Sequence, residues 1–168
     1  MIISLTGFMG CGKSSVGRRL SELLCCHFMD LDAEIEAREG RSIAEIFAKD
    51  GEAEFRRIEK ETLTDIIGTP VSSAVLALGG GAVMTPGSEE IVHENSVCVY
   101  LKASVDTLIE RLSNETSGRP LLKDVPLRER IMDLMSQRAS TYERAAHIII
   151  ETDGKSIDEI AREIISLS

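Results

Sequence analysis

The sequence predicts an α/β fold in three layers, in which helices cover both faces of a five-stranded parallel sheet. Short apolar runs, which are typical of buried strands, alternate along the chain with stretches whose apolar residues recur three or four positions apart. Strands that alternate with helices in this way form parallel sheets covered on both faces. With 168 residues, of which 43% are apolar, the chain is long enough for one globular domain with its own core.

Each predicted strand is a short apolar run with little polar alternation, as expected for a strand that is buried on both faces of a sheet. The first ends close to Gly7, the second ends ahead of Asp30, and the third runs into three consecutive glycines. The last contains three consecutive isoleucines. The five strands span residues 1–5, 27–29, 71–78, 96–101 and 147–151.

The predicted helices follow from the spacing of their apolar residues, such as Val16 and Leu20 on one face of the first helix. Gly40 and Gly51 separate the helices that come next, and the last helix is amphipathic. The helices span residues 12–25, 34–38, 43–49, 53–67, 105–112 and 157–167. A polar connection at residues 113–125 lies between two helices, and a loop of that length in a compact domain is usually functional.

Composition excludes several classes of function. The net charge of −9 argues against nucleic acid as the main partner, because phosphate backbones require a basic surface. No apolar run approaches the roughly 20 residues that span a bilayer, and the N-terminal run is too short for a secretory signal. The four cysteines show no CxxC spacing. We therefore expect a cytoplasmic protein with reduced thiols, without nucleic acid or membrane partners, and monomeric.

Residues 7–14, Gly-Phe-Met-Gly-Cys-Gly-Lys-Ser, match the phosphate-binding pattern G-x-x-x-x-G-K-[ST] between a predicted strand and a predicted helix. Glycines allow backbone N–H groups to approach phosphate oxygens without a side chain in the way. The helix that begins near Gly12 adds the positive end of its dipole. In this motif Lys13 contacts the β and γ phosphates, and the Ser14 hydroxyl binds Mg²⁺. The sequence therefore predicts a P-loop NTPase that binds ATP with Mg²⁺.

The rest of the sequence narrows the class of P-loop protein. A GTPase requires an N-K-x-D motif, and asparagine occurs only at Asn95 and Asn114, neither of which is followed by lysine. The size of the chain fits a small-molecule kinase, which also needs an acceptor pocket and a lid that excludes water. Asp30 and Asp32 follow the predicted strand at 27–29, and the glycines at 79–81 follow the one at 71–78. We expect them at the carboxyl edge of the sheet, where parallel sheets bind ligands.

Six segments occur in an order and at spacings that resemble the shikimate kinase family over essentially the whole chain. They are the P-loop at 7–14, Phe-Met-Asp-Leu-Asp at 28–32, Gly-Glu-Ala-Glu-Phe-Arg-Arg-Ile-Glu at 51–59, Gly-Gly-Gly-Ala-Val at 79–83, Gly-Arg-Pro-Leu-Leu at 118–122 and Gln-Arg-Ala-Ser-Thr-Tyr at 137–142. The resemblance implies transfer of the γ-phosphate of ATP to the 3-hydroxyl of shikimate, a step toward chorismate and the aromatic amino acids. It also implies a helical substrate-binding region at about 31–60 and a mobile lid at about 113–125, both within one domain over residues 1–168.

The resemblance assigns a role to each motif residue. Asp32 would orient the attacking hydroxyl and accept its proton. Arg56 and Arg138 would bind the substrate carboxylate, with Glu59 fixing Arg56 by an ion pair. The backbone at Gly79, Gly80 and Gly81 would approach the substrate closely. The implied substrate-binding residues are thus Asp32, Arg56, Gly79, Gly80, Gly81 and Arg138.

For the nucleotide, Arg119 would move onto the transferring phosphate like an arginine finger, and Arg111 would flank the adenine. The implied catalytic residues are Asp32, Lys13 and Arg119. The implied nucleotide-binding residues are Gly10, Cys11, Gly12, Lys13, Ser14, Ser15, Arg111 and Arg119, and the implied Mg²⁺ ligands are Ser14 and Asp30. Cys11 departs from the family, in which many members carry Ala or Ser, and we expect its side chain to point away from the phosphates.

Other interpretations of the same residues stay open. Asp30 and Asp32 are also typical helix caps, and Arg56 fits the solvated face of a charged helix. A gluconate kinase-like enzyme would share the P-loop and the size of the chain. A nucleotide-binding module without catalytic activity is a third alternative, although Lys13 and both aspartates are present.

Overall fold

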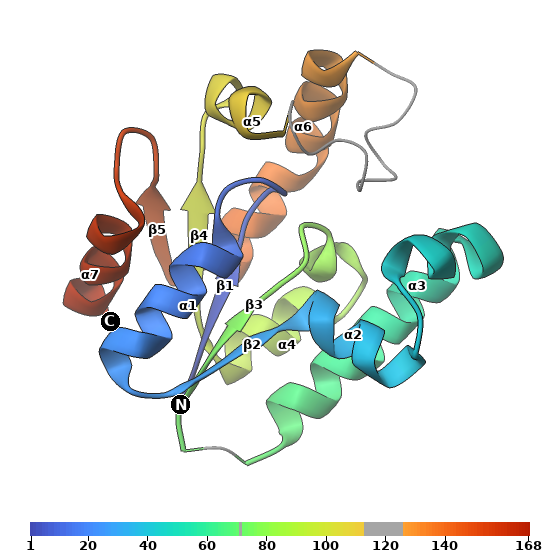
Figure 1. Cartoon of the computed structure of the whole chain (residues 1–168), viewed down its shortest axis with the longest axis horizontal. Coiled ribbons are helices and arrows are strands. Elements are labelled where there is room, and N and C mark those ends of the chain that lie inside the picture. The colour runs from blue at the N-terminus through green and yellow to red at the C-terminus, as the bar shows by residue number, and fades with distance from the viewer. Residues whose placement is uncertain (71, 113–125) are drawn as a thin grey trace.

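The computed structural model describes residues 1–70, 72–112 and 126–168. Within these residues, five strands form one parallel sheet in the order β2-β3-β1-β4-β5 (Figure 1). The strands are β1 (Ile2–Thr6), β2 (His27–Asp30), β3 (Ala74–Ala77), β4 (Val97–Lys102) and β5 (Ile148–Glu151). The predicted parallel sheet is therefore confirmed.

Strand β1 occupies the centre of the sheet and is buried along its whole length. Leu5 pairs with Ala77 of β3, and Thr6 pairs with Tyr100 of β4. The loop that follows β1 therefore emerges at the middle of the carboxyl edge of the sheet, with the ends of β3 and β4 on either side.

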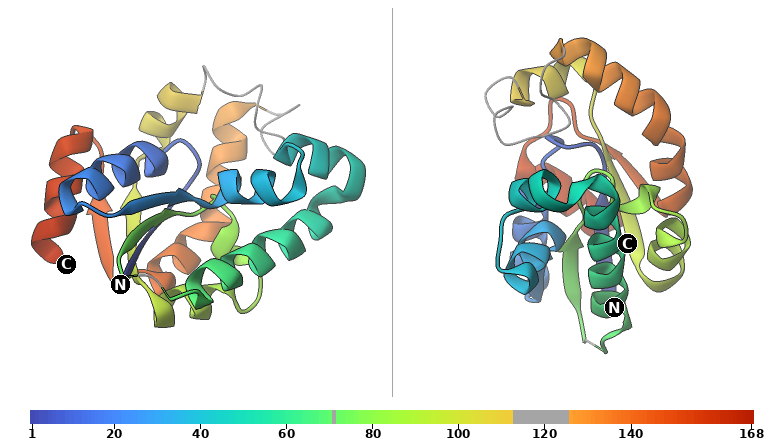
Figure 2. Two further views of the ribbon diagram at one scale, coloured as in Figure 1. Left: turned by 60° about the horizontal axis from the view of Figure 1, so that its bottom comes forward. Right: turned by 90° about the vertical axis from the view of Figure 1, so that its right-hand side faces the viewer.

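Helices cover both faces of the sheet, so the predicted three-layer arrangement is also confirmed. Helix α1 packs beside α7 on one face, and α4 packs beside α6 on the other (Figures 1 and 2). The helices are α1 (Lys13–Leu24), α2 (Leu31–Glu39), α3 (Ile43–Gly68), α4 (Ser88–Asn95), α5 (Val105–Leu112), α6 (Leu127–Ala145) and α7 (Ile157–Leu167), with a 3₁₀ turn η1 (Ala82–Met84) after β3. Helices α2 and α3 lie at the opposite side of the molecule from β5 and α7 (Figure 1).

Several element boundaries differ from the prediction. Helix α2 begins at Leu31 rather than at residue 34, because the Asp30 side chain accepts a hydrogen bond from the Ala33 N–H and caps the helix there. Strand β3 begins at Ala74, and Val71, the first residue of the predicted strand, lies outside the described residues.

The two helices predicted on either side of Gly51 are both present, and the single label α3 spans them across a break in the helical backbone at that glycine. Gly51 has φ of +86° and ψ of 172°, a backbone conformation that residues with a side chain rarely adopt. No helix in the described part of the chain is long and apolar enough to cross a membrane.

Candidate active site

The loop between β1 and α1 curves around an open space at the edge of the sheet. Gly7 and Gly10 have φ of +146° and +83°, which favour glycine. A Cβ on Gly7 would lie 2.6 Å from the carbonyl oxygen of Leu101. The loop can therefore follow this path only with glycine at Gly7, and helix α1 begins directly after it at Lys13.

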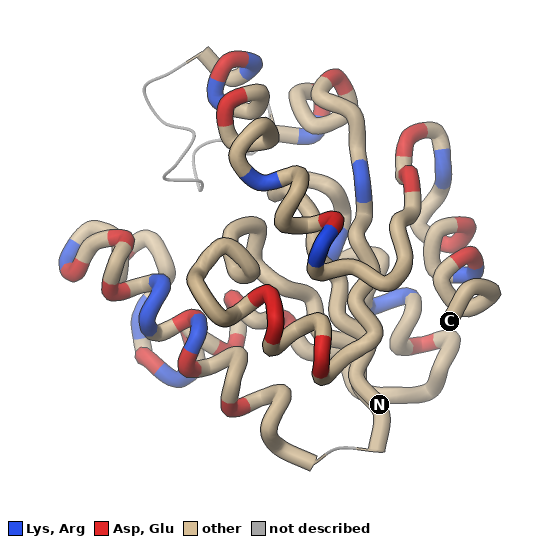
Figure 3. The backbone as a smooth tube through the Cα atoms, turned by 180° about the vertical axis from the view of Figure 1, so that it is seen from behind, with Lys and Arg blue, Asp and Glu red and all other residues tan. Residues whose placement is uncertain are grey.

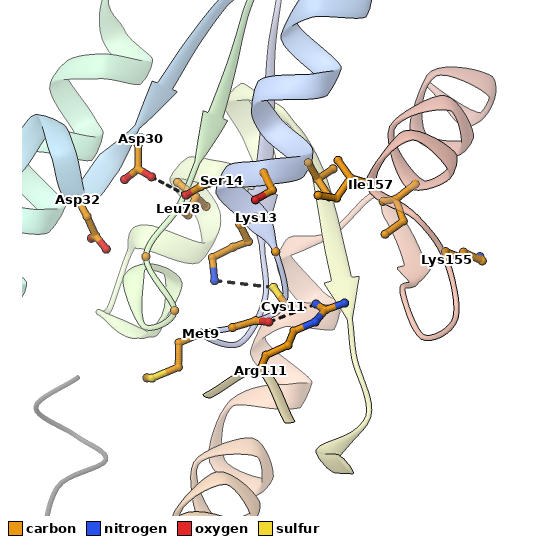
Figure 4. Close-up of a pocket in the computed structure, with 17 residues that line it drawn as sticks. Met9, Cys11, Lys13, Ser14, Asp30, Asp32, Leu78, Arg111, Lys155 and Ile157 are labelled. Carbon is orange, nitrogen blue, oxygen red and sulfur yellow. Dashed lines mark hydrogen bonds between the residues drawn. The ribbon is translucent and has the colours of Figure 1, made fainter. Parts of the chain in front are cut away.

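Lys13 extends back over the loop that precedes it (Figure 4). Its Nζ donates hydrogen bonds to the carbonyl oxygens of Gly7 and Phe8, at 2.7 and 3.1 Å. The ammonium group is thus held at the mouth of the loop. Cys11 is buried, and its Sγ lies 3.9 Å from the Lys13 Nζ.

Ser14 and Asp30 bring a hydroxyl and a carboxylate together beside the loop. Ser14 Oγ donates to Asp30 Oδ2 at 2.7 Å, while Asp30 Oδ1 accepts the Ala33 N–H at 3.3 Å (Figure 4). Asp30 therefore both caps α2 and faces the P-loop. The described residues contain no cluster of three or more His, Cys, Asp or Glu side chains that could hold a metal ion. A cation bound by Ser14 and Asp30 would take its other ligands from phosphate and water, as Mg²⁺ commonly does.

The loop lines a cavity of about 500 Å³. Arg111 lies on one wall, where its Nη1 donates to the carbonyl oxygen of Gly10 at 3.2 Å. Lys155, Ile157 and Ile160 form the wall contributed by the C-terminal segment. The remaining lining residues are Met9, Gly10, Cys11, Gly12, Lys13, Ser14, Ser15, Val16, Asp30, Asp32, Leu78, Gly79 and Gly80.

A second cavity of about 410 Å³ adjoins the first. Met9, Asp32, Gly79 and Gly80 line both. The second cavity has an apolar side made by side chains of α3, and a charged side that carries two arginines. The other lining residues are Glu36, Ser42, Ile43, Ala44, Phe47, Phe55, Arg56, Glu59, Gly81 and Arg138.

The charged side of the second cavity is built on an ion pair. Arg56 Nη1 lies 2.9 Å from Glu59 Oε1, and the Glu59 side chain is only 1% exposed. Burial raises the pKa of Glu59 above its usual range, and the neighbouring Arg56 guanidinium opposes that increase. The second oxygen of Glu59 has no hydrogen-bond partner among the described residues. The pair thus holds the Arg56 guanidinium at the cavity wall.

Arg138 reaches the same cavity from α6. It is 7% exposed, and its Nη1 has no hydrogen-bond partner in the described part of the chain. A buried guanidinium nitrogen without a partner is costly in the free protein, and a bound anion would satisfy it. Arg56 and Arg138 line the same cavity, and guanidinium groups are suited to bind a carboxylate or another planar anion.

The glycines at 79–81 form a turn between the two cavities, closed by a hydrogen bond of 3.1 Å from the Ala82 N–H to the Gly79 carbonyl. A Cβ on Gly79 would lie 3.0 Å from Asp32 Oδ1, and one on Gly81 would lie 2.6 Å from the nearest Arg56 nitrogen. A larger residue at either glycine would therefore displace a side chain of the site.

Comparison with known proteins identifies the family. A sequence model described as Shikimate kinase matches residues 9–168. The chain belongs to the shikimate kinase family. A shikimate kinase of Thermus thermophilus is 44% identical over 163 residues, which cover 97% of this chain and 87% of that protein. One from Dictyoglomus turgidum is 42% identical, with coverage of 97% and 94%.

Solved structures of shikimate kinases share the fold. Shikimate kinase from Acinetobacter baumannii, solved in complex with shikimate, is 36% identical, with a TM-score of 0.93 over 99% of this chain and 91% of that one. The Aquifex aeolicus shikimate kinase is also 36% identical, with a TM-score of 0.85 and coverage of 99% and 95%. The family resemblance that the six motifs indicate is therefore confirmed.

The structure brings the predicted shikimate kinase motifs together at one edge of the sheet. Among described residues, every candidate for nucleotide, metal or substrate binding lines one of the two cavities. Arg119 and the predicted lid at 113–125 lie outside the described residues. Phe47, Phe55 and Ile43 line the second cavity without having been predicted, because apolar residues on a helix indicate a core face equally well.

Proposed function

We propose that this protein transfers the γ-phosphate of ATP to the 3-hydroxyl of shikimate, giving shikimate 3-phosphate and ADP. The observation that carries the proposal is the junction of the two cavities at Asp32, Gly79 and Gly80. A nucleotide on the P-loop would direct its terminal phosphate toward this junction. A small hydroxylated acid in the second cavity would direct a hydroxyl toward the same point.

The second cavity suits the functional groups of shikimate. Arg56 and Arg138 would bind the carboxylate, with Glu59 holding Arg56 in place. Asp32, at the junction, would accept the hydrogen bond of the attacking hydroxyl on a carboxylate oxygen and take its proton during transfer. The apolar side of the cavity would contact the carbon face of the ring. The A. baumannii relative was solved with shikimate as its ligand, which supports the same acceptor here.

On the nucleotide side, the backbone N–H groups of the P-loop and the N-terminus of α1 would bind the phosphates. Ser14 and Asp30 would hold Mg²⁺, which neutralises phosphate charge when bound. Lys13, close to the loop carbonyls, would exchange those contacts for phosphate oxygens. Arg119 is proposed to stabilise the charge on the transferring group. Positioning and charge neutralisation would provide most of the acceleration.

The far end of the first cavity is proposed to hold adenine. Arg111 would flank it on one side, and Ile157 of α7 would offer an apolar surface on the other. Lys155, just before α7, lies on the same wall. We further propose that the protein acts in the cytoplasm, where ATP is available, as a monomer of 18.4 kDa. Sedimentation at that mass would test the oligomeric state.

One assay tests the function against its alternatives. ADP release is measured with MgATP and shikimate, with gluconate, and with no acceptor. We expect release with shikimate alone. Release with gluconate instead would indicate a gluconate kinase-like enzyme, and the absence of release with either would indicate a nucleotide-binding module. The motif set and the family membership favour shikimate.

A further inference from the structure

The hydroxyl of Tyr142 contacts the glycine turn that separates the two cavities. Tyr142 lies on α6, and its side chain is fully buried. Its hydroxyl donates a hydrogen bond to the carbonyl oxygen of Gly80. Burial raises the pKa of Tyr142 above its usual range, although the neighbouring Arg138 opposes this increase. The phenol therefore keeps its proton at neutral pH, and the contact persists.

This contact fixes the orientation of the peptide that follows. A trans peptide is planar, and its carbonyl and N–H point in opposite directions. Holding the Gly80 carbonyl toward Tyr142 therefore directs the Gly81 N–H away from α6. The turn is already closed by the hydrogen bond between Ala82 and Gly79, so the Gly80–Gly81 peptide is the part that Tyr142 orients.

Tyr142 also connects the turn to Arg138. The two residues are four positions apart on α6, so they lie on the same face of the helix. A Cβ on Gly80 would lie 3.6 Å from Arg138 Nη1, so the turn and the guanidinium are already neighbours. The hydroxyl thus sets the spacing between two parts of the second cavity that come from different elements.

We propose that Tyr142 is a positioning residue for the acceptor. Its hydroxyl fixes the position of the Gly79–Gly81 turn relative to the Arg138 guanidinium. The turn backbone and the guanidinium can then bind the acceptor at the same time. The inference rests on the proposed function, because shikimate is the acceptor used to test it. Tyr142 lines neither cavity, so it would act through the turn rather than by touching a substrate.

Tyr142→Phe tests the proposal because it removes the hydroxyl and leaves the ring in place. We expect the KM for shikimate to rise about tenfold, which corresponds to about 1.4 kcal/mol and suits the loss of one buried hydrogen bond. The KM for ATP should change by less than about twofold, because the P-loop is held by its own contacts. Calorimetric titration with shikimate in the absence of ATP should show the same loss of affinity.

Tyr100→Phe is the matched control. Tyr100 is buried, its ring centroid lies 5.2 Å from that of Tyr142, and its hydroxyl has no hydrogen-bond partner among the described residues. The same atom is removed next to the same site, so we expect neither KM to change. Thermal unfolding of both variants would show that they are folded.

The outcomes separate the two proposals. A wild-type protein that does not phosphorylate shikimate contradicts the proposed function. If the wild type is active and Tyr142→Phe retains its KM for shikimate, or raises both KM values equally, the positioning role is wrong. A measurement on the wild type alone adds a second test. The Tyr142 hydroxyl proton should give an NMR signal that shifts with shikimate and not with ADP, and a signal indifferent to shikimate would overturn the inference.

Discussion

Asp30 and Asp32 are two positions apart, yet Asp30 lines only the first cavity and Asp32 lines both. Asp30 ends β2, caps α2 and accepts a hydrogen bond from the Ser14 hydroxyl, so its two oxygens face the start of α2 and the P-loop. Asp32 lies in the first turn of α2 and lines both cavities. Because α2 begins at Leu31, the Asp32 side chain projects from the first turn of the helix toward Gly79. The cap interpretation and the site interpretation of Asp30 are therefore compatible, because its two oxygens have different partners.

Asp32→Asn should leave ATP binding intact and reduce turnover. The amide is nearly the same size but cannot accept the proton of the attacking hydroxyl, and positioned bases contribute about 10²–10⁴-fold to rates. We expect kcat to fall by at least about a hundredfold. Steady-state kinetics and nucleotide titration would measure both quantities, and a kcat near that of the wild type would exclude a role for Asp32 in proton transfer.

Glu59→Gln should weaken shikimate binding by loosening Arg56. The buried ion pair becomes a neutral hydrogen bond, so the guanidinium is held less firmly at the cavity wall. We expect the KM for shikimate to rise about five- to tenfold, the effect of about 1 kcal/mol, with the KM for ATP unchanged.

Glu54→Gln is the control for Glu59→Gln on the same helix. Glu54 pairs with Arg57, whose side chain is 59% exposed, and the pair lies outside both cavities. Exposed ion pairs contribute little, so this variant should match the wild type. Equal effects of the two variants would mean that α3 is sensitive to charge in general and that Glu59 has no specific role.

At the scale of the elements, the C-terminal helix contributes to both stability and the nucleotide cavity. Ser156 caps α7 by accepting the Glu159 N–H at 3.1 Å, and the Glu159 side chain accepts the Ser156 N–H in return. The next residue, Ile157, lines the cavity around the P-loop. The cap therefore fixes the position at which this wall of the cavity begins.

Ser156→Ala should lower the free energy of unfolding by about 1 kcal/mol, as the loss of a helix cap typically does. Urea unfolding would measure the change. Ser166→Ala is the control, because among the described residues the Ser166 hydroxyl bonds only to the Glu163 carbonyl in the last turn of the same helix. Alanine is the better helix former there, so this variant should be as stable as the wild type or slightly more stable. A destabilisation of equal size in both would contradict the capping role.

The elements also show what sequence patterns can and cannot predict. The sheet was predictable because buried parallel strands are apolar throughout. Helix α6 was expected only as a helix after residue 125, without bounds. Its buried face includes Arg138, which lines the second cavity, and Tyr142, which bonds the Gly80 carbonyl, and these polar groups interrupt the apolar periodicity. Helix α4 was missed because, of its eight residues, only Ser88 and Val92 are buried.

Motif residues were predictable and their supporting contacts were not. The P-loop can be recognised from the spacing of its residues, and its glycines Gly7, Gly10 and Gly12 all have positive φ. The contact between Tyr142 and Gly80 joins residues 62 positions apart, and no local pattern indicates it. The same holds for His93 and His147, whose rings stack with centroids 4.2 Å apart.

At the scale of the whole molecule, basic and acidic side chains nearly balance in the lining of the two cavities, while the net charge of the chain is −9. Figure 3 shows basic and acidic residues interspersed along the helices. The two cavities are lined by the basic residues Lys13, Arg56, Arg111, Arg138 and Lys155 and by the acidic residues Asp30, Asp32, Glu36 and Glu59. The lining is thus much less negative than the chain as a whole, which reduces the repulsion that anionic substrates would meet there.

Stability should decrease as the pH falls below about 6.5, the ordinary pKa of histidine. Burial, together with the neighbouring His93, lowers the pKa of His147 in the folded protein. The unfolded chain therefore takes up a proton at His147 at a higher pH than the folded protein does, and protonation favours unfolding until the folded pKa is passed. Protonation at Nδ1 would also remove the acceptor of the Cys98 N–H, which is 3.0 Å away.

His147→Asn would isolate this contribution. The asparagine oxygen can accept the Cys98 N–H but does not titrate, while the other ionisable groups are common to both proteins. Urea unfolding between pH 5 and 8 should give a shallower loss of stability for the variant, and identical pH profiles would rule out a contribution from His147.

The wall shared by the two cavities has a consequence for inhibitor design. Both cavities are bordered by Met9, Asp32, Gly79 and Gly80. A nucleotide in the first cavity and an acceptor in the second would therefore come close to each other at these residues. A bisubstrate compound that joins a phosphate chain to a cyclohexene carboxylate would need only a short linker. Once one half is bound, the other is held at high effective concentration beside its own pocket. Such a compound would combine the affinities of two modest ligands in a single molecule.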